Sequence, residues 1–205
     1  MLLCDIGNTS YHFLDEDVNY KKEVVDFDPS VVTETVYYIS VNQAASLRLT
    51  VLKNWINLAD FVDMSKYYIT MGIDRICAVA AVTNAVIVDA GSAITVDIVK
   101  DEEFHGGFIY PGVKAMQETY KNISPALDYS FNFDLDLDIM PKNSQDAISY
   151  GFIKTFYSEV NLHKLPIILT GGDAQKFKKI FKNATVDEEL IFRGMKHLIK
   201  KADKC

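Results

Sequence analysis

The chain has 205 residues, of which 49% are hydrophobic and 24% are charged, and its formal net charge at pH 7 is -7. These are ordinary values for a soluble globular protein with one large domain or two small ones that share an interface. The acidic balance argues against a nucleic-acid-binding protein, which needs clustered Lys and Arg. It does not exclude a phosphate-bearing substrate, because local dipoles and a bound metal can outweigh net charge.

The cysteines and the apolar runs of the sequence indicate in which cellular compartment the protein is expected. Cys4, Cys77 and Cys205 are far apart and form no CxxC pair, so we expect neither a disulfide framework nor a zinc site, and a reducing cytoplasm fits. Asp5 interrupts the N-terminus after three apolar residues, which leaves no signal-peptide core. No apolar run reaches about 18 residues, so no membrane span is expected.

Residues 1–14 predict a hairpin: an apolar strand that ends at Asp5, a turn with Gly7, Asn8 and Thr9, and a second strand. Residues 18–25 and 37–41 are predicted as further strands. Residues 46–58 predict a helix, because the apolar residues recur at helical spacing. Those residues are Leu49, Leu52, Trp55 and Ile56.

A second helix is predicted over residues 72–82, and its small residues indicate that something packs closely against it. Asp74 lies near its start, where a carboxylate is favoured as a cap and by the helix dipole. Taken alone, Asp74 is best interpreted as that cap. The adjacent Arg75 and the preceding Gly72 leave a functional role open.

Residues 86–99 repeat the plan of the first hairpin. Aligning Asp89 with Asp5 also aligns Gly91 with Gly7 and Ser92 with Asn8. Small residues at such a turn let an anion approach backbone N–H groups, and an Asp at the strand end can hold a cation beside it. Two matching hairpins favour a duplicated domain with a ligand between the copies, although two unrelated Asp-x-Gly turns remain an alternative.

Residues 104–112 predict a strand interrupted by Gly106 and Gly107, which suggests close approach of a ligand or simply a bulge. A helix should begin at Val113, and Pro125 should end it or start the next turn. Over residues 128–141, Asp134, Asp136 and Asp138 alternate with apolar residues. This alternation favours the solvated face of a strand over a metal cluster.

Residues 144–160 predict a helix capped by Ser144, and residues 187–200 predict the final helix. Between them, an apolar strand enters Gly171 and Gly172, with a helix expected after Asp173. Such strand–turn–helix units place backbone and a helix N-terminus against a nucleotide.

Several familiar catalytic motifs are absent from the sequence. It contains no GxxxxGK[ST], GxGxxG, HExxH or GxSxG, and its four histidines show no ligand-like spacing.

Taken together, these segments resemble the type III pantothenate kinases of the acetate and sugar kinase/actin superfamily. The Gly-x-Asp-Arg and Gly-Gly-x-Ile-x-Pro-Gly elements point to this family, whereas Asp-x-Gly hairpins mark only the superfamily. The matching segments are, in order, Asp5-Ile-Gly-Asn-Thr9, Gly72-Ile-Asp-Arg75, Asp89-Ala-Gly-Ser-Ala93, Gly106-Gly-Phe-Ile-Tyr-Pro-Gly112, Asn143-Ser144 and Thr170-Gly-Gly-Asp-Ala174.

The resemblance implies an α/β fold of two ribonuclease-H-like, actin-like ATPase halves with the active-site cleft between them, here divided as residues 1–80 and 81–205. It also implies ATP-dependent phosphorylation of pantothenate, the first step of coenzyme A synthesis, by a cytoplasmic homodimer. Mg²⁺ would accompany ATP, and a monovalent cation, K⁺ or NH₄⁺, would be needed.

Residue roles carry over in the same way. Asp74 would be the general base, Arg75 would hold the substrate carboxylate, Asp89 would bind the monovalent cation and Asp5 would lie close to magnesium. The pantothenate contacts would be Tyr68, Gly72, Ile73, Asp74, Arg75 and Ser144. The ATP contacts would be Asp5, Ile6, Gly7, Asn8, Thr9, Ser10, Tyr11, His12 and Ser92.

This chain departs from the family pattern at a few positions. The family usually has Thr where Ser92 and Ser144 stand, but both keep the hydroxyl. The loop before Gly72 is short, so Tyr67 and Tyr68 compete for the substrate contact, and we favour Tyr68. Ser144 could act in its own subunit or in the partner's.

The chemistry is consistent without the family, because phosphoryl transfer needs charge neutralisation and positioning more than covalent help. Two rival functions stay open. One is a non-enzymatic regulator or binding protein on the same fold, against which the intact set of Asp and Arg residues argues. The other is a ribonuclease-H-like nuclease with metals on Asp5, Asp89 and Asp97, against which the acidic net charge argues.

Overall fold

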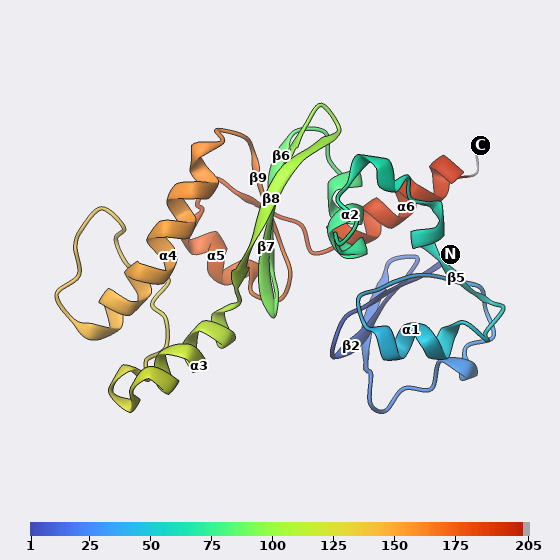
Figure 1. Cartoon of the computed structure of the whole chain (residues 1–205), viewed down its shortest axis with the longest axis horizontal. Helices are drawn as coiled ribbons and strands as arrows, with labels where there is room; N and C mark the ends of the chain where they lie inside the picture. The colour runs from blue at the N-terminus through green and yellow to red at the C-terminus, as the bar shows by residue number, and fades with distance from the viewer. Residues whose placement is uncertain (203–205) are drawn as a thin grey trace. The chain divides into compact units, whose positions relative to one another are not determined.

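The computed structural model describes residues 1–202 and divides by internal contacts into two compact units. Unit 1 is Met1–Ala81 together with the C-terminal segment from Glu189, and unit 2 is Val82–Glu188. Each unit contains one five-stranded sheet. Figure 1 shows the labelled elements, and Cys205 lies outside the described residues.

The sheet of unit 1 has the order β3-β2-β1-β4-β5. The strands are β1 (Leu2–Ile6), β2 (Ser10–Asp15), β3 (Val18–Glu23), β4 (Val36–Ser40) and β5 (Trp55–Asn57). The first three form an antiparallel meander, and β4 and β5 continue the sheet in parallel with β1. The predicted hairpin and the strands near residues 18 and 37 are therefore confirmed.

Alternation along β1 gives this sheet two apolar faces. Leu2, Cys4 and Ile6 lie on one face, in a cluster that also takes in Leu49 of helix α1 (Gln43–Leu49). Leu3 lies on the other, against helices α2 (Ile73–Ala80) and α6 (Leu190–Ala202). Residues two apart share a face, so Asp5 belongs with Leu3.

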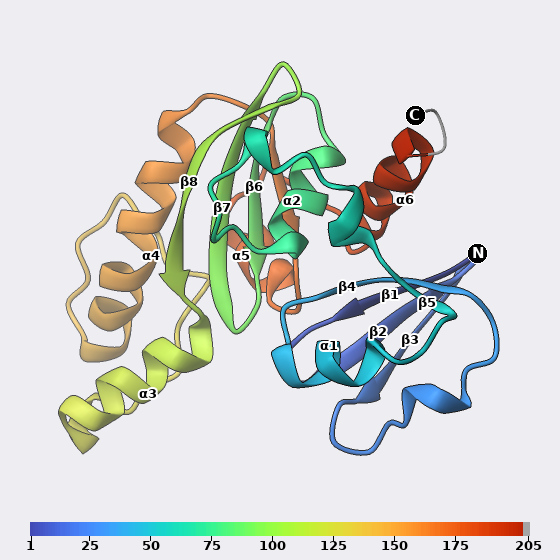
Figure 2. The same cartoon turned by 45° about the vertical axis from the view of Figure 1, so that its right-hand side comes forward.

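Helices α2 and α6 lie side by side, as Figures 1 and 2 show. A Cβ added to Gly194 of α6 would lie 1.8 Å from the carbonyl oxygen of Cys77 on α2. Only a glycine permits so close an approach of the two backbones. The small residues of α2 predicted close packing, and α6 of the same chain supplies it.

The predicted helix over residues 46–58 is wrong in its second half. Helix α1 begins earlier, because the Asn42 side chain accepts a hydrogen bond from Ala45 N, and it ends at Leu49. The Asn54 side chain donates to the carbonyl oxygens of Val32 and Glu34, which brings the chain to the sheet edge. Trp55 then pairs with Val36 as the first residue of β5.

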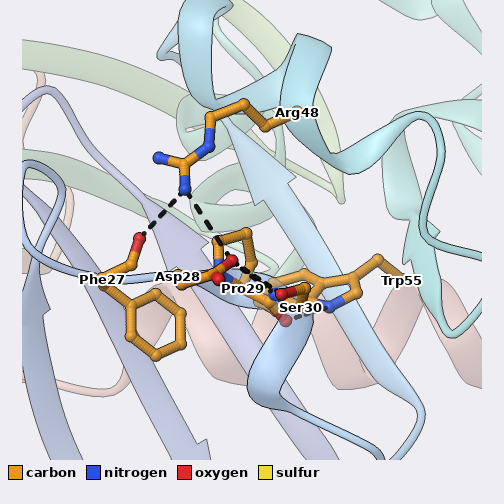
Figure 3. Close-up of polar contacts among 6 residues, drawn as sticks. All are labelled: Phe27, Asp28, Pro29, Ser30, Arg48 and Trp55. Carbon is orange, nitrogen blue, oxygen red and sulfur yellow. Dashed lines mark hydrogen bonds and ion pairs between the residues drawn. The ribbon is translucent and has the colours of Figure 1, made fainter.

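Figure 3 shows how side chains hold the loop before β4 in place. The Trp55 indole donates to the carbonyl oxygen of Pro29 at 3.3 Å, and Asp28 accepts from Ser30 N at the start of the short 3-10 helix η1 (Pro29–Val31). Arg48 of α1 donates to the carbonyl oxygen of Phe27 at 3.3 Å. Trp55, one of the apolar residues at helical spacing, thus serves a strand and the loop beside it. Two further 3-10 helices follow β5, η2 (Leu58–Phe61) and η3 (Met64–Lys66).

The sheet of unit 2 repeats that of unit 1. Its strands are β6 (Ala85–Ala90), β7 (Ala93–Lys100), β8 (Glu103–Pro111), β9 (Ile167–Thr170) and β10 (Thr185–Val186), in the order β10-β9-β6-β7-β8. Here β6, β7 and β8 are antiparallel, and β9 and β10 run parallel to β6. Strand for strand, β6 to β10 therefore match β1 to β5 in order and direction.

The core of unit 2 covers one face of its sheet. Val86 and Val88 of β6 pack there with Phe152 and Phe156 of α4 (Ser144–Leu162) and Phe177 of α5 (Ala174–Ile180). Figures 1 and 2 show α4 and α5 on that face. Helix α3 (Val113–Ile123) follows β8 as expected, and η4 (Pro125–Leu127) begins at the predicted break.

Two predictions in unit 2 need correction. Residues 128–141 contain no strand: the Asp136 side chain accepts from Asp138 N in a local turn, and Leu135 and Leu137 pack against the core. The alternation of exposed Asp and partly buried Leu side chains therefore comes from the path of this loop and not from a pleated strand. The cap of α4 is Asn143, whose side chain accepts from Asp146 N, and Ser144 is the first helical residue.

The last helix, α6, belongs to one repeat by topology and to the other unit by its contacts. By topology, α6 follows β10 as α2 follows β5, so it ends the second repeat, as in the division into residues 1–80 and 81–205. By contacts it packs within unit 1. That division stays a prediction about the repeats. In residues 1–202, no helix is both long enough and apolar enough to cross a membrane.

Candidate active site

The first predicted phosphate turn joins β1 to β2. Gly7 N donates to the carbonyl oxygen of Ser10 at 3.0 Å, which closes the turn, while the Asn8 and Thr9 side chains face solvent. Neighbouring segments anchor the turn: Val41 N donates to the Ile6 carbonyl oxygen. The arrangement can present backbone and short polar side chains to an anion.

Strand register separates the residues of this turn into two groups. Asp5 and His12 are direct cross-strand partners, so they share the sheet face that carries α2 and α6. Tyr11 lies on the opposite face, fully buried, in ring contact with Phe27 and Trp55. Ile6 is buried on that face too. Tyr11 and Ile6 can therefore offer a ligand only their backbone.

Burial sets the protonation of the groups around Asp5. It lowers the pKa of His12, while a hydrogen bond with Asn19 partly opposes that shift, so the imidazole is neutral at pH 7. Burial, reinforced by the negative charges of Asp5 and Asp74, raises the pKa of the Cys77 thiol. Cys4 shows the same direction, from burial first and Asp5 second. Both thiols stay protonated and are poor nucleophiles.

The Gly72–Arg75 segment forms the first turn of α2. Gly72 is the N-cap residue and makes no side-chain cap. Asp74 Oδ1 accepts from Arg75 N at 2.8 Å, and a Cβ added to Gly72 would lie 2.4 Å from that oxygen. A side chain at position 72 would thus displace the carboxylate. Gly72 is needed for the room it leaves and not for an unusual backbone angle.

Arg75 links α2 to the loop before it. Its side chain is 5% exposed, donates to the Tyr68 hydroxyl and lies with Cζ 5.7 Å from the centroid of the Tyr68 ring. Tyr67 instead borders a pocket of about 340 Å³ shared with Leu198, and burial raises its pKa. These contacts favour Tyr68 over Tyr67 as the residue next to the guanidinium.

The second phosphate turn joins β6 to β7 and has glycines around it. Gly91 N donates to the Ala93 carbonyl oxygen at 3.0 Å. A Cβ on Gly112 would lie 2.2 Å from the Ser92 carbonyl oxygen, and one on Gly171, whose φ is +84°, would lie 2.3 Å from Asp89 Oδ1. Two glycine motifs that lie far apart in the sequence, before α3 and after β9, therefore meet at this turn.

Asp89 occupies the centre of a polar row across the sheet of unit 2. Its direct partners are Thr95 on β7 and Thr170 on β9, and side chains at paired positions point to the same face. The Thr95 hydroxyl oxygen is buried and, within residues 1–202, has no hydrogen-bond partner. Thr95 was not among the predicted site residues, although counting back from the turn places it opposite Asp89.

The other residues that could touch ligands lie elsewhere in unit 2. Ser144 is exposed on the first turn of α4. A pocket of about 400 Å³ opens between α3, α4 and α5, and Val113, next to Gly112, lies on its wall together with Lys176. Lys176 pairs with Asp173 at 2.7 Å, and Asp173 N donates to the Ala90 carbonyl oxygen, so the pocket adjoins the Ser92 turn. Its volume is that of a small-molecule site.

Within residues 1–202, no group of three or more His, Cys, Asp and Glu side chains could hold a metal ion. Mg²⁺ does not need one, because it is commonly held by one or two carboxylates together with substrate phosphates. Asp5 beside the first turn fits that pattern. Asp89 and the buried Thr95 hydroxyl offer the oxygen donors that suit a hard cation.

Comparison with known proteins decides the family. A family profile described as type III pantothenate kinase matches residues 28–163. A Sulfurimonas denitrificans protein named type III pantothenate kinase is 60% identical over 205 residues, which covers both chains in full. The chain belongs to the type III pantothenate kinase family. This family phosphorylates pantothenate in coenzyme A biosynthesis.

Solved structures agree on the fold. One from Campylobacter jejuni, named for a proposed role as a Baf family transcriptional activator, has a TM-score of 0.89 at 38% identity and covers all of both chains. Another from Sinorhizobium meliloti, named for a proposed 2-dehydro-3-deoxygalactonokinase, has a TM-score of 0.56 at 10% identity, over 98% of this chain and 96% of that one. The fold is thus the two-domain α/β fold of actin-like ATPases and sugar kinases.

Proposed function

We propose that this chain transfers the terminal phosphoryl group of ATP to the primary hydroxyl of pantothenate and releases 4'-phosphopantothenate. The observation that carries the proposal is the arrangement at the start of α2. There Gly72 leaves room for the Asp74 carboxylate, and Arg75 is held against Tyr68.

The acceptor would bind through its two ends. The Arg75 guanidinium can take the pantothenate carboxylate in a bidentate pair, with the Tyr68 hydroxyl beside it. Asp74 would then orient the hydroxyl and accept its proton, and the backbone of Gly72 and Ile73 would line the same site. A carboxylate is a weak base near neutral pH, but the hydroxyl proton leaves late in a loose transition state. Ser144 would add a polar contact from α4.

The phosphates of ATP would bind at the two turns. Residues 5–12 supply backbone and the short side chains of Asn8, Thr9 and Ser10, with His12 at the end of the same segment. Ser92 supplies a hydroxyl from the second turn. The pocket beside Val113 and Lys176 is suited to the nucleoside, so Lys176→Ala should raise the KM for ATP and leave the KM for pantothenate unchanged.

Two cations would complete the site. Asp5 would hold Mg²⁺ that arrives with ATP, and Asp89 would hold a K⁺ or NH₄⁺ ion. Such ions neutralise negative charge that develops on the phosphoryl oxygens. We place the enzyme in the cytoplasm and expect a homodimer, both from the family resemblance.

The name of the Campylobacter jejuni relative raises a second candidate, a transcriptional regulator without kinase activity. The net charge of -7 gives no support to direct DNA binding. An enzymatic test separates the two.

The test is a coupled assay of ADP release by the purified chain with ATP, Mg²⁺ and K⁺. We expect release that depends on pantothenate, none with an analogue that lacks the primary hydroxyl, and a raised KM for the carboxamide analogue, which cannot pair with Arg75 as an anion. ADP release that is absent, or that is indifferent to pantothenate, would refute the proposal.

A further inference from the structure

We infer that the hydroxyl of Thr95 is a second protein ligand, beside the Asp89 carboxylate, for the monovalent cation. This inference rests on the cation site assigned to Asp89 under the proposed function. It adds a residue that the sequence motifs did not mark, because Thr95 lies between the apolar residues Ile94 and Val96 in an ordinary alternating strand.

Register places the two groups together. Asp89 on β6 is the direct antiparallel partner of Thr95 on β7. Directly opposed residues have Cβ atoms roughly 4.5–5.5 Å apart and point to the same face of the sheet. Val88 and Val96, the neighbouring pair, point to the apolar core with α4. Asp89 and Thr95 therefore face away from that core.

Burial gives the Thr95 hydroxyl a reason to need a ligand. Its oxygen is one of two buried side-chain polar atoms that lack a hydrogen-bond partner within residues 1–202. Native proteins satisfy nearly all buried polar groups, and a bound water or ion is one recognised reason for an orphaned one. A hydroxyl aligned with a carboxylate on the same face offers neutral and anionic oxygen together.

Glycine backbone comes close to the Asp89 carboxylate. A Cβ added to Gly171 would lie only 2.3 Å from Asp89 Oδ1, and a Cβ added to Gly91 would lie 3.9 Å from the same oxygen. Gly171 thus leaves the room that the Asp89 carboxylate occupies. A carboxylate oxygen next to a buried hydroxyl supplies the kind of oxygen donors that suit a hard cation.

The matching position in unit 1 shows that this pair is not a general property of the repeat. There the partner of Asp5 is His12, whose Nε2 already has a hydrogen bond with Asn19. The other orphaned hydroxyl among the described residues, that of Tyr11, is in the unit 1 hairpin but lies on the opposite face of the sheet from Asp5. This difference assigns the monovalent ion to Asp89 and Thr95, and leaves Asp5 to the magnesium that comes with ATP.

The experiment measures the stability of the cation-bound protein and needs no catalysis. Melting temperatures of the full chain are recorded in KCl, NH₄Cl and choline chloride at equal ionic strength, for wild type, Thr95→Val and Thr95→Ser. Val keeps the shape of Thr and removes the oxygen, whereas Ser keeps the oxygen. Thr185→Val, on the exposed side of β10, is the matched control.

We expect K⁺ to raise the melting temperature of wild type, Thr95→Ser and Thr185→Val, since an ion that binds only the folded state stabilises it. Thr95→Val should need about tenfold more K⁺ for the same rise. In choline chloride, Thr95→Val should melt no lower than wild type, because removing an unsatisfied hydroxyl costs no hydrogen bond.

A Thr95→Val response to K⁺ equal to that of wild type would overturn the inference, and so would a wild type that does not respond to either cation. The proposed function is judged separately by pantothenate-dependent ADP release. If the chain releases ADP but Thr95→Val responds to K⁺ as wild type does, only this inference is overturned and the proposed function stands.

Discussion

At the scale of single residues, the site depends on room as much as on charge. Gly72 has φ -62° and ψ 140°, values that any residue can adopt. Its importance comes from the Asp74 carboxylate, which fills the space where a side chain would be. The same holds for Gly171 beside Asp89, where a positive φ adds a second restriction.

Gly72→Ala tests whether that space positions Asp74. The new methyl group must displace the carboxylate. We therefore expect turnover to fall by about 10²-fold, which is the effect of moving a catalytic group by about 1 Å. Stability should fall by no more than about 1 kcal/mol, the usual effect at an N-cap.

Gly151→Ala on α4 is the control, because its new Cβ would meet only the Tyr120 hydroxyl, at 3.8 Å. It should keep full turnover, measured in the same coupled assay. Equal turnover for Gly72→Ala and Gly151→Ala would show that Asp74 does not depend on Gly72.

At the scale of elements, caps decided where helices begin. Asn42 starts α1 and Asn143 starts α4, although Ser46 and Ser144 stand where the periodic pattern begins. The sequence therefore predicted the existence of these helices better than their first residues. The cap at Asn143 also frees the Ser144 hydroxyl from that task, which leaves it for a ligand.

Asn143→Ala and Ser144→Ala should separate stability from binding. Loss of the Asn143 cap should cost about 1 kcal/mol, seen as a lower melting temperature with an unchanged KM for pantothenate. Ser144→Ala should leave the melting temperature unchanged and raise that KM. A lower melting temperature for Ser144→Ala, with no change for Asn143→Ala, would show that Ser144 and not Asn143 caps the helix.

At the scale of the whole molecule, the sequence predicted the duplication and most strands, because alternation with an Asp-x-Gly turn is a local signal. It could not predict that Trp55 begins a strand, because Leu49, Leu52 and Trp55 share helical spacing. Only the pairing of Trp55 with Val36 shows that Trp55 belongs to a strand and not to a helix. The site motifs are local signals and could be predicted too. Thr95 carries no such motif, and only its register to Asp89, counted back from the turn, singles it out.

The homodimer remains a prediction from the family resemblance. The small residues of α2 lend it no support, because α2 uses them against α6 of the same chain, where Gly194 meets Cys77. Light scattering at micromolar concentration should give twice the chain mass of 23.1 kDa. A fully active monomer would rule the dimer out.

The central claim is that Asp74 is the base of a pantothenate kinase, and the turnover of Asp74→Asn tests it most directly. Asn keeps the size and an oxygen for the start of α2 but loses the charge. We predict a fall in turnover of roughly 10²–10⁴-fold, with melting temperature and ATP affinity near those of wild type, while Asp60→Asn on the surface keeps full turnover. A stable Asp74→Asn protein with near-normal turnover would contradict the claim and reduce Asp74 to a residue that only supports the helix.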